Sequence, residues 1–270
     1  MKKYLFYIVL YLVIVLHSQC LNAQSDSEDV STSTEYWLDY NMKYSINENK
    51  SISGSLGVRS ISPHIYTKFF LEPTFNILHL KSLKYFNLKT PIIHSFHLGV
   101  GLFYTNNIDE VDDVEFRIMQ GFQIFTPKIK GIFLKNYIRL EERFQKTLTD
   151  ASPWTFGLRM RYKISTVFEW KKKGTTFDKG LYLPMNIEFF FNIKKSESDN
   201  DQIRISPGIG YKFNNDWRCE FSVSYQNTKN VTADDQTTNS LVFRLRLFRS
   251  NIIRGLFIQN KDDQLKELME

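Results

Sequence analysis

Charged side chains recur at every second position in several segments between residues 139 and 246, and their chemistry is the most distinctive in this sequence. Arginine predominates, and glutamate stands two residues from arginine in two of the segments. Arginine can bind carboxylates or small anions in a bidentate manner, so such residues can either pair with one another or bind an anion. The set is Arg139, Glu141, Arg143, Arg159, Arg161, Lys163, Arg204, Lys212, Arg218, Glu220, Arg244 and Arg246.

Histidine-based catalysis has weaker support. Ser95 and His97 share the polar face of one alternating segment, but a serine and a histidine two residues apart match no known triad signature. A catalytic base needs a nucleophile within hydrogen-bond reach and, usually, a partner that orients it. We therefore expect no catalytic residues and no enzymatic activity. Among the histidines, His97 is the best placed to act as a base. A serine, a histidine and an asparagine or aspartate meeting in one pocket would instead favour a hydrolase.

Metal, nucleotide and nucleic-acid binding are not favoured either. The acidic clusters Asp109–Asp113 and Asp234-Asp235 could offer oxygen ligands, but they lack the glycine-spaced order of a calcium loop and are interpreted as solvated loops. The sequence contains no zinc-binding spacing, phosphate-binding loop or dinucleotide fingerprint, so no metal or cofactor is expected. The formal net charge of +6 falls to +4 without residues 1–23, which is too small to favour nucleic acid.

The alternation of polar and apolar residues extends along nearly the whole chain. In the decapeptide 217–226, for example, Trp217, Phe221 and Val223 fall on one face and Arg218 and Glu220 on the other. A period of two is that of a half-buried β-strand, so we predict an all-β protein. The eleven segments with this pattern are 34–46, 51–60, 65–77, 93–105, 114–126, 132–146, 154–170, 181–193, 203–213, 217–226 and 241–248.

Three features indicate that the apolar faces point outward, into lipid. Several segments exceed the ~9–11 residues that cross a bilayer at a tilt. Aromatic residues such as Trp154 and Tyr225 lie near segment ends, as in interfacial girdles. The polar faces combine glycine and serine with charges of both signs. We predict a single antiparallel up-and-down transmembrane β-barrel in the bacterial outer membrane, with membrane lipids as partners. The alternative is a secreted or periplasmic soluble β-barrel that binds an apolar ligand inside.

The expected number of strands is about twelve, because single-chain bacterial barrels normally have an even number. Short connections at 128–130 and 214–216 are expected at the periplasmic end, and polar loops 106–113, 147–152, 195–201 and 228–237 at the outer end. With eleven strands, this assignment of the connections to the two ends of the barrel would leave the N-terminus outside the cell. One further crossing between residues 78 and 92 would correct it; ten strands are the alternative.

Both ends of the chain have features that separate them from the barrel. Lys2 and Lys3 precede an apolar run, and Ala23 offers a small residue before a cleavage site, as in a secretory signal peptide. We predict a signal peptide at 1–23, a disordered segment at 24–33, the barrel at 34–249 and a periplasmic tail with a short helix at 250–270. Cleavage would remove Cys20 and leave Cys219 alone, so no intrachain disulfide is expected.

Several motifs resemble those of a known family. They are Tyr36-Trp37, the stretch 138–144, Arg159-x-Arg161, the stretch 206–213 that runs into 217–226, and the stretch 243–248. Over roughly residues 34–248 the sequence resembles small Gram-negative outer-membrane barrels catalogued as domain of unknown function twenty-four ninety. The resemblance implies location and architecture but no activity and no catalytic residues. Members of the family are expected to end at an aromatic residue of the last strand, which would be Phe248 here. The tail after this residue departs from that pattern.

In such a barrel the charged set would line the lumen, and two interpretations remain open. Neighbouring strands lie ~4.8 Å apart, so the arginines and glutamates could form a ladder that fills a narrow barrel. Alternatively, the excess of arginine and lysine could line a small anion-preferring pore, since rings of these residues select anions. The sequence thus predicts an integral outer-membrane β-barrel of structural or pore type. An outer-membrane barrel hydrolase is the second alternative to this function.

Overall fold

The computed structural model describes residues 32–62, 66–78, 93–108, 110–125, 134–149, 151–169, 179–194, 201–229 and 237–250. The predicted signal peptide and nearly all of the predicted tail lie outside these residues. In the described part of the chain, no helix is long and apolar enough to cross a membrane. The described strands are β1 (Thr32–Asn47), β2 (Lys50–Ser62), β3 (Tyr66–Leu78), β4 (Ile93–Asn107), β5 (Asp113–Phe125), β6 (Lys135–Thr147), β7 (Thr155–Glu169), β8 (Gly180–Lys194), β9 (Asp201–Lys212), β10 (Trp217–Lys229) and β11 (Thr237–Ser250).

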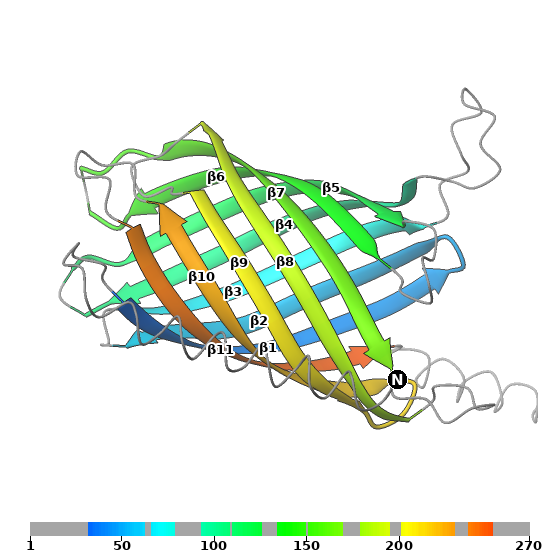
Figure 1. The fold of residues 1–270 in the computed structure, drawn as a ribbon. Helices are drawn as coiled ribbons and strands as arrows, with labels where there is room; N and C mark the ends of the chain where they lie inside the picture. The colour runs from blue at the N-terminus through cyan, green and yellow to red at the C-terminus, as the bar shows by residue number, and fades with distance from the viewer. Residues whose placement is uncertain are drawn as a thin grey trace, which may run out of the picture. The chain divides into compact units, whose positions relative to one another are not determined.

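These strands form a closed barrel, which confirms the all-β prediction (Figure 1). Every segment predicted as a strand is a strand, with ends that differ by four residues at most. Each strand pairs antiparallel with the next strand along the chain, and β1 pairs with β11 to close the ring. That last pair is parallel, with Thr32 opposite Asn239 and Lys43 opposite Ser250.

The predicted strand number and the purely antiparallel wall are both wrong for the described barrel. Eleven strands close it, and β3 pairs directly with β4, so the wall has no position for an added strand between them. The crossing predicted between residues 78 and 92 lies almost entirely outside the described residues. Because consecutive strands run in opposite directions, an odd number makes the first and last strands run the same way. The seam between β1 and β11 must therefore be parallel.

The odd strand number places the start of β1 and the end of β11 at opposite ends of the barrel. We call these the N-end and the C-end. The N-end has the connections 63–65, 108–112, 148–154, 195–200 and 230–236, and the C-end has 48–49, 79–92, 126–134, 170–179 and 213–216. The loops predicted to lie together thus fall at the N-end. The predicted turn at 128–130 lies outside the described residues.

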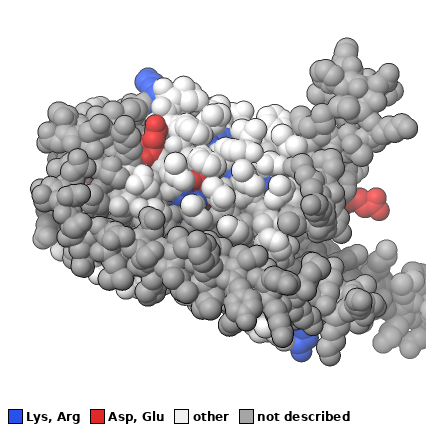
Figure 2. All heavy atoms as spheres, viewed as in Figure 1, with Lys and Arg blue, Asp and Glu red and all other residues white. Residues whose placement is uncertain are grey.

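The barrel is apolar outside and charged inside. Phe221 and Leu245 are 43% and 44% exposed on the outer face, whereas Glu141 is 0% exposed on the inner face. Large apolar side chains of this kind are exposed on all the described strands, and the described part of the surface in Figure 2 is largely uncharged. A soluble β-barrel would have the opposite polarity, because apolar side chains in water are driven inward. The arrangement agrees with the predicted direction of the two faces.

Glycines on the inner face make room for aromatic rings from neighbouring strands. Gly210 on β9 lies opposite Tyr182 on β8, and a Cβ atom at Gly210 would lie 2.3 Å from Cζ of that ring. The Tyr182 hydroxyl donates a hydrogen bond of 2.7 Å to Glu220 Oε1 on β10. The glycine therefore allows the tyrosine to reach across β9 to a buried carboxylate.

Gly210→Ala is expected to destabilise the barrel by about 1–3 kcal/mol, since the added methyl group would displace the Tyr182 ring. Gly54→Ala is the matched control, because a Cβ atom there meets nothing closer than 4.0 Å, and its effect should stay within about 0.5 kcal/mol. Urea unfolding of both variants in one detergent measures the difference. Equal midpoints for the two variants would contradict the packing described.

Candidate functional site

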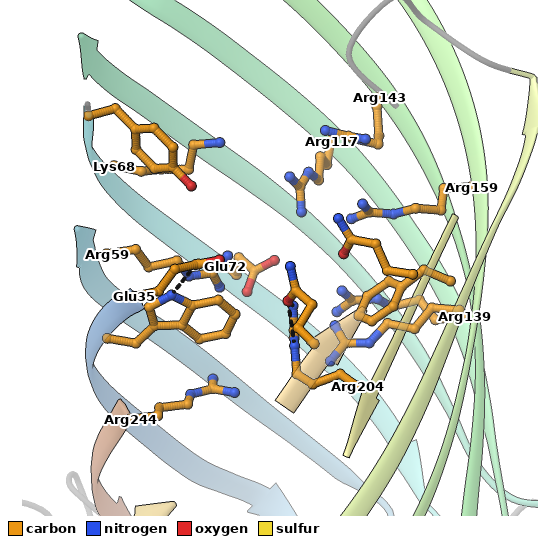
Figure 3. Close-up of a pocket in the computed structure, with 16 residues that line it drawn as sticks. Glu35, Arg59, Lys68, Glu72, Arg117, Arg139, Arg143, Arg159, Arg204 and Arg244 are labelled. Carbon is orange, nitrogen blue, oxygen red and sulfur yellow. Dashed lines mark hydrogen bonds between the residues drawn. The ribbon is translucent and has the colours of Figure 1, made fainter. Parts of the chain in front are cut away.

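The inner face of the barrel lines a cavity of about 280 Å³ in which positive charge predominates. We call it the arginine cavity. Side chains from ten of the strands line it, and guanidinium groups converge there from opposite walls (Figure 3). Its two carboxylates are Glu35 and Glu72, and its nine cationic residues are Arg59, Lys68, Arg117, Arg139, Arg143, Arg159, Arg161, Arg204 and Arg244.

A second cavity, of about 890 Å³, lies toward the C-end. We call it the polar cavity. Its lining includes Leu78, Lys212 and Phe248, each at or near the last residue of a strand that ends at the C-end. Serine, asparagine, lysine and histidine side chains make up much of the remaining lining. The two cavities thus divide the described lumen into an arginine-rich section and a wider, more mixed section.

Glu141 on β6 is a fully buried carboxylate of the arginine-rich section. It accepts hydrogen bonds from Arg139 on its own strand and from Arg159 on β7, the latter at 2.9 Å and 2.6 Å. Arg117 Nη1 on β5 lies 3.9 Å from the same carboxylate. Glu115 on β5 makes a similar site nearer the N-end, where it accepts from Arg117 Nη2 at 2.9 Å and from Arg143 Nε at 2.5 Å. The register places these residues on neighbouring strands, so the pairs run along the wall and not across the lumen.

Glu188 on β8 holds a second group of cations. Arg161 Nη2 lies 2.7 Å, Lys163 Nζ 3.1 Å and Arg204 Nη1 3.3 Å from its carboxylate oxygens. Arg204 also donates to Gln226 Oε1 on β10 through Nε, at 2.9 Å. Three strands, β7, β8 and β9, are joined in this way by one buried negative charge.

Two further buried carboxylates form ion pairs with arginines of β11, near the seam between β1 and β11. Asp39 on β1 accepts from Arg244 Nε on β11 at 2.5 Å, across the parallel pair. Glu220 on β10 lies 2.7 Å from Arg246 Nη2 and 3.8 Å from Arg218 Nε. The seam is therefore closed by an ion pair as well as by backbone hydrogen bonds.

Trp37 narrows the arginine cavity. Its ring centroid lies 4.2 Å from the guanidinium carbon of Arg59 on β2 and 4.6 Å from that of Arg204 on β9. Its indole nitrogen donates to Glu35 Oε2 at 2.8 Å. Arg244 lies over the same ring at 5.2 Å. Cations stack favourably on tryptophan faces, so the ring stabilises these guanidinium groups in the lumen without neutralising them. Arg59 Nε is buried and makes no hydrogen bond within the described residues.

A serine, a histidine and an asparagine meet in the polar cavity. Ser95 Oγ lies 2.7 Å from His97 Nε2, and His97 Nδ1 lies 2.5 Å from Asn76 Oδ1. All three residues line the cavity. Ser95 and His97 are on β4, and the β3–β4 register places Asn76 directly opposite His97. A serine, a histidine and an asparagine that meet in one pocket are the arrangement expected of a hydrolase.

The family model described as "Protein of unknown function (DUF2490)" matches residues 34–237. The chain belongs to the DUF2490 family. This confirms the resemblance found in the sequence motifs. No protein in the search of curated proteins matches the chain. Among solved structures, it is similar to the translocator domain of autotransporter NalP from Neisseria meningitidis, with 12% sequence identity and a TM-score of 0.42, over 68% of this chain and 70% of that chain.

In this DUF2490 protein, the twelve charged residues named from the sequence all face the lumen. Arg139, Arg143, Arg159, Arg161, Arg204 and Arg244 line the arginine cavity; Lys163, Lys212, Arg218, Glu220 and Arg246 line the polar cavity; and Glu141 is buried in the wall. The set from the sequence contains no residue of β1 to β5 or of β8. The same inward alternation in those strands adds Asp39, Arg59, Lys68, Glu115, Arg117 and Glu188, so the alternation signal could have found them.

The acidic loop at the N-end of the DUF2490 barrel is organised by hydrogen bonds. Asp112 accepts from the Tyr104 hydroxyl, from Asn106 Nδ2 at 3.2 Å and from the backbone nitrogen of Asn107 at 3.1 Å. The bond from Tyr104 holds the pKa of the Asp112 carboxyl below its usual value. Within the described residues, no group of three or more histidine, cysteine, aspartate or glutamate side chains could hold a metal ion.

Proposed function

We propose that this DUF2490 protein is an integral outer-membrane β-barrel whose narrow lumen conducts small anions in preference to cations. The observation that carries the proposal is the lining of the arginine cavity, with nine cationic side chains and two carboxylates. A lumen with such an excess attracts anions and repels cations, because its low-dielectric wall focuses the field of the charges.

The outer face supports a position in a membrane. The strands are 12–16 residues long, enough to cross a bilayer at a tilt. Large apolar side chains such as Leu38, Leu102 and Ile203 are exposed along them, which water would disfavour and acyl chains would solvate. The soluble alternative requires an apolar interior for its ligand. The arginine cavity offers charged side chains instead, so its lining argues against that alternative.

The ion pairs of the wall bear on the choice between a filled lumen and a pore. Glu141, Glu188, Glu220 and Asp39 pair with cations on the same strand or on neighbouring strands, and these pairs lie against the wall. They reduce the positive charge without bridging opposite walls. Arg59 keeps a buried nitrogen without a hydrogen bond. The ion-pair ladder and the anion pore are therefore compatible. The ladder stabilises the barrel wall, and the cations in excess line the conducting path.

Planar-bilayer recording in a KCl gradient tests the proposal. We expect small single-channel conductances and a zero-current voltage displaced toward the chloride equilibrium potential. The double variant Arg59→Gln/Lys68→Gln should bring that voltage closer to zero, whereas Lys146→Gln, which removes the same kind of charge from the outer face, should leave it unchanged. Displacement toward the potassium potential, or no conductance from folded and inserted protein, would reject an anion-preferring pore.

A further inference from the structure

We propose that Ser95, His97 and Asn76 form a hydrolase site in the polar cavity, which cleaves small carboxylic esters that carry a negative charge. The inference goes beyond anion conduction and does not depend on it. It rests on the geometry of the three residues and on a register shift in the strand beside them. It also rests on the side-chain amide of Gln123, which lies beside the serine and can donate a hydrogen bond. Ser95 and His97 are the catalytic residues, and Asn76 is a positioning residue.

The atoms that meet are those that nucleophilic catalysis requires. Asn76 Oδ1 can only accept, so the proton of the neutral histidine lies on Nδ1, which donates to it over 2.5 Å. Nε2 then carries the lone pair and accepts the hydroxyl proton of Ser95 over 2.7 Å. A nucleophile, a base and an orienting group are thus connected in the order of a catalytic triad, with asparagine in the third position.

The orientation of Asn76 is fixed by β2. Its Nδ2 donates to Ser53 Oγ at 3.0 Å and to the backbone oxygen and side chain of Ser51 at 3.3 Å. These acceptors determine which end of the amide faces His97. The ring of Tyr137 packs edge-on against the imidazole, with centroids 5.2 Å apart. The histidine is therefore held on two sides before any substrate binds.

The strand is irregular where the nucleophile lies. The β4–β5 register shifts between Ile93 and Ser95. Such bulges re-aim side chains and are common beside active sites. Gln123 lies directly opposite Ser95 and lines the polar cavity, and its side-chain amide makes no hydrogen bond within the described residues. It can donate to the oxyanion that forms when Ser95 attacks a carbonyl carbon.

The polar cavity sets the class of substrate. Lys43 and Lys135 line it, and neither makes an ion pair within the described residues, so they can bind an anionic group of the ester. The mixed polar lining disfavours a long acyl chain. Ser95 is 0% exposed, so a substrate must displace the side chains that cover the serine. We therefore expect slow turnover and a preference for short acyl groups.

The reaction follows from these groups and one water molecule. Ser95 Oγ bonds to the carbonyl carbon while its proton passes to His97 Nε2, and the carbonyl oxygen becomes an oxyanion. When this intermediate collapses, the bond to the alcohol oxygen breaks and the alcohol leaves with the proton from Nε2. Water then attacks the acyl-serine, giving its proton to His97. Collapse releases the carboxylic acid and returns the proton to Ser95, so the net change is ester plus water to acid plus alcohol.

Covalent labelling of the folded protein in detergent tests the site directly. A small alkyl fluorophosphonate should form one adduct, found by intact mass and placed by peptide mapping on Ser95. Ser95→Ala should remove the adduct, whereas Ser222→Ala, at a buried inward serine of β10, should keep it. No adduct on the folded wild-type protein, or an adduct at another residue, would overturn the proposal.

The roles of the other residues have separate readouts. His97→Gln and Asn76→Ala should lower the labelling rate by ~10²–10⁴-fold, and Asn76→Asp should restore most of it. Wild-type protein should hydrolyse mono(4-nitrophenyl) succinate with a lower KM than 4-nitrophenyl acetate, and Lys135→Gln should remove that preference. Unchanged labelling in His97→Gln would contradict base catalysis. Ser95→Ala should conduct like wild type, so failure of the hydrolase proposal and failure of the pore proposal are distinguishable.

Discussion

Replacing Glu141 by glutamine is expected to destabilise the barrel by about 3–5 kcal/mol. The carboxylate is fully buried and binds Arg139 and Arg159, with Arg117 nearby. Glutamine has almost the same shape but no charge, so the substitution leaves two or three guanidinium groups facing one another without compensation. Removing one partner of a buried ion pair is costly for this reason, even where the intact pair contributes little net stability.

Glu142→Gln provides the control from the same strand. Glu142 faces outward and interacts with Gln120 Nε2 at 3.2 Å, so its loss should change the stability by about 0.5 kcal/mol at most. Urea titrations of both variants, followed by the mobility difference between folded and heated protein on gels, give the two free energies of unfolding. If the variants unfold at the same urea concentration, the Glu141 network does not stabilise the wall.

Replacing Leu245 by arginine is expected to cost about 2–4 kcal/mol in a lipid bilayer. Leu245 lies near the middle of β11 and is 44% exposed on the outer face, opposite Phe221 of β10. At this depth a guanidinium group would displace acyl chains or draw water into the membrane. In a soluble barrel with Leu245 in a dry core, the same substitution would abolish folding.

Leu241→Arg is the control that separates the effect of depth in the membrane from the effect of introducing an arginine. Leu241 points outward on the same strand but lies nearer the N-end, so the arginine could extend toward the interface and should cost less. Both variants are measured by urea titration of folded protein in phospholipid vesicles. Equal costs, or a failure of Leu245→Arg to fold in vesicles and in detergent, would be inconsistent with a lipid-facing strand.

The strands and the direction of their faces could be predicted because they depend on local alternation. The segment 217–226, for example, contains the whole inside–outside pattern of β10 in ten residues. Ring closure could not be predicted in this way, because it depends on pairing between β1 and β11. Asp39 and Arg244 are 205 residues apart, and no local pattern announces their contact. The rule that bacterial barrels have even strand numbers then favoured twelve over the eleven observed.

The candidate site was predictable to the extent that one strand contains it. The inward arginines of β6 to β11 follow from alternation, and Ser95 and His97 share a face for the same reason. Asn76 lies 21 residues away from His97 and meets it only through the β3–β4 register. Trp37 and Arg204 likewise meet because the wall curves back on itself, with β11 and β10 between their strands. These contacts depend on strand register and on closure of the barrel, and neither can be inferred from the spacing of residues in the sequence.

Fluorescence quenching by lipids with brominated acyl chains tests the central claim most directly, since it reports which face meets the hydrocarbon. One variant keeps Trp37 as its only tryptophan, with Trp154, Trp170 and Trp217 replaced by phenylalanine, and a second adds Phe221→Trp to it. In vesicles, the account predicts weak quenching of Trp37 in the lumen and strong quenching of the added tryptophan on the outer face. Strong quenching of Trp37, or an added tryptophan at 221 that the brominated chains do not quench, would contradict it.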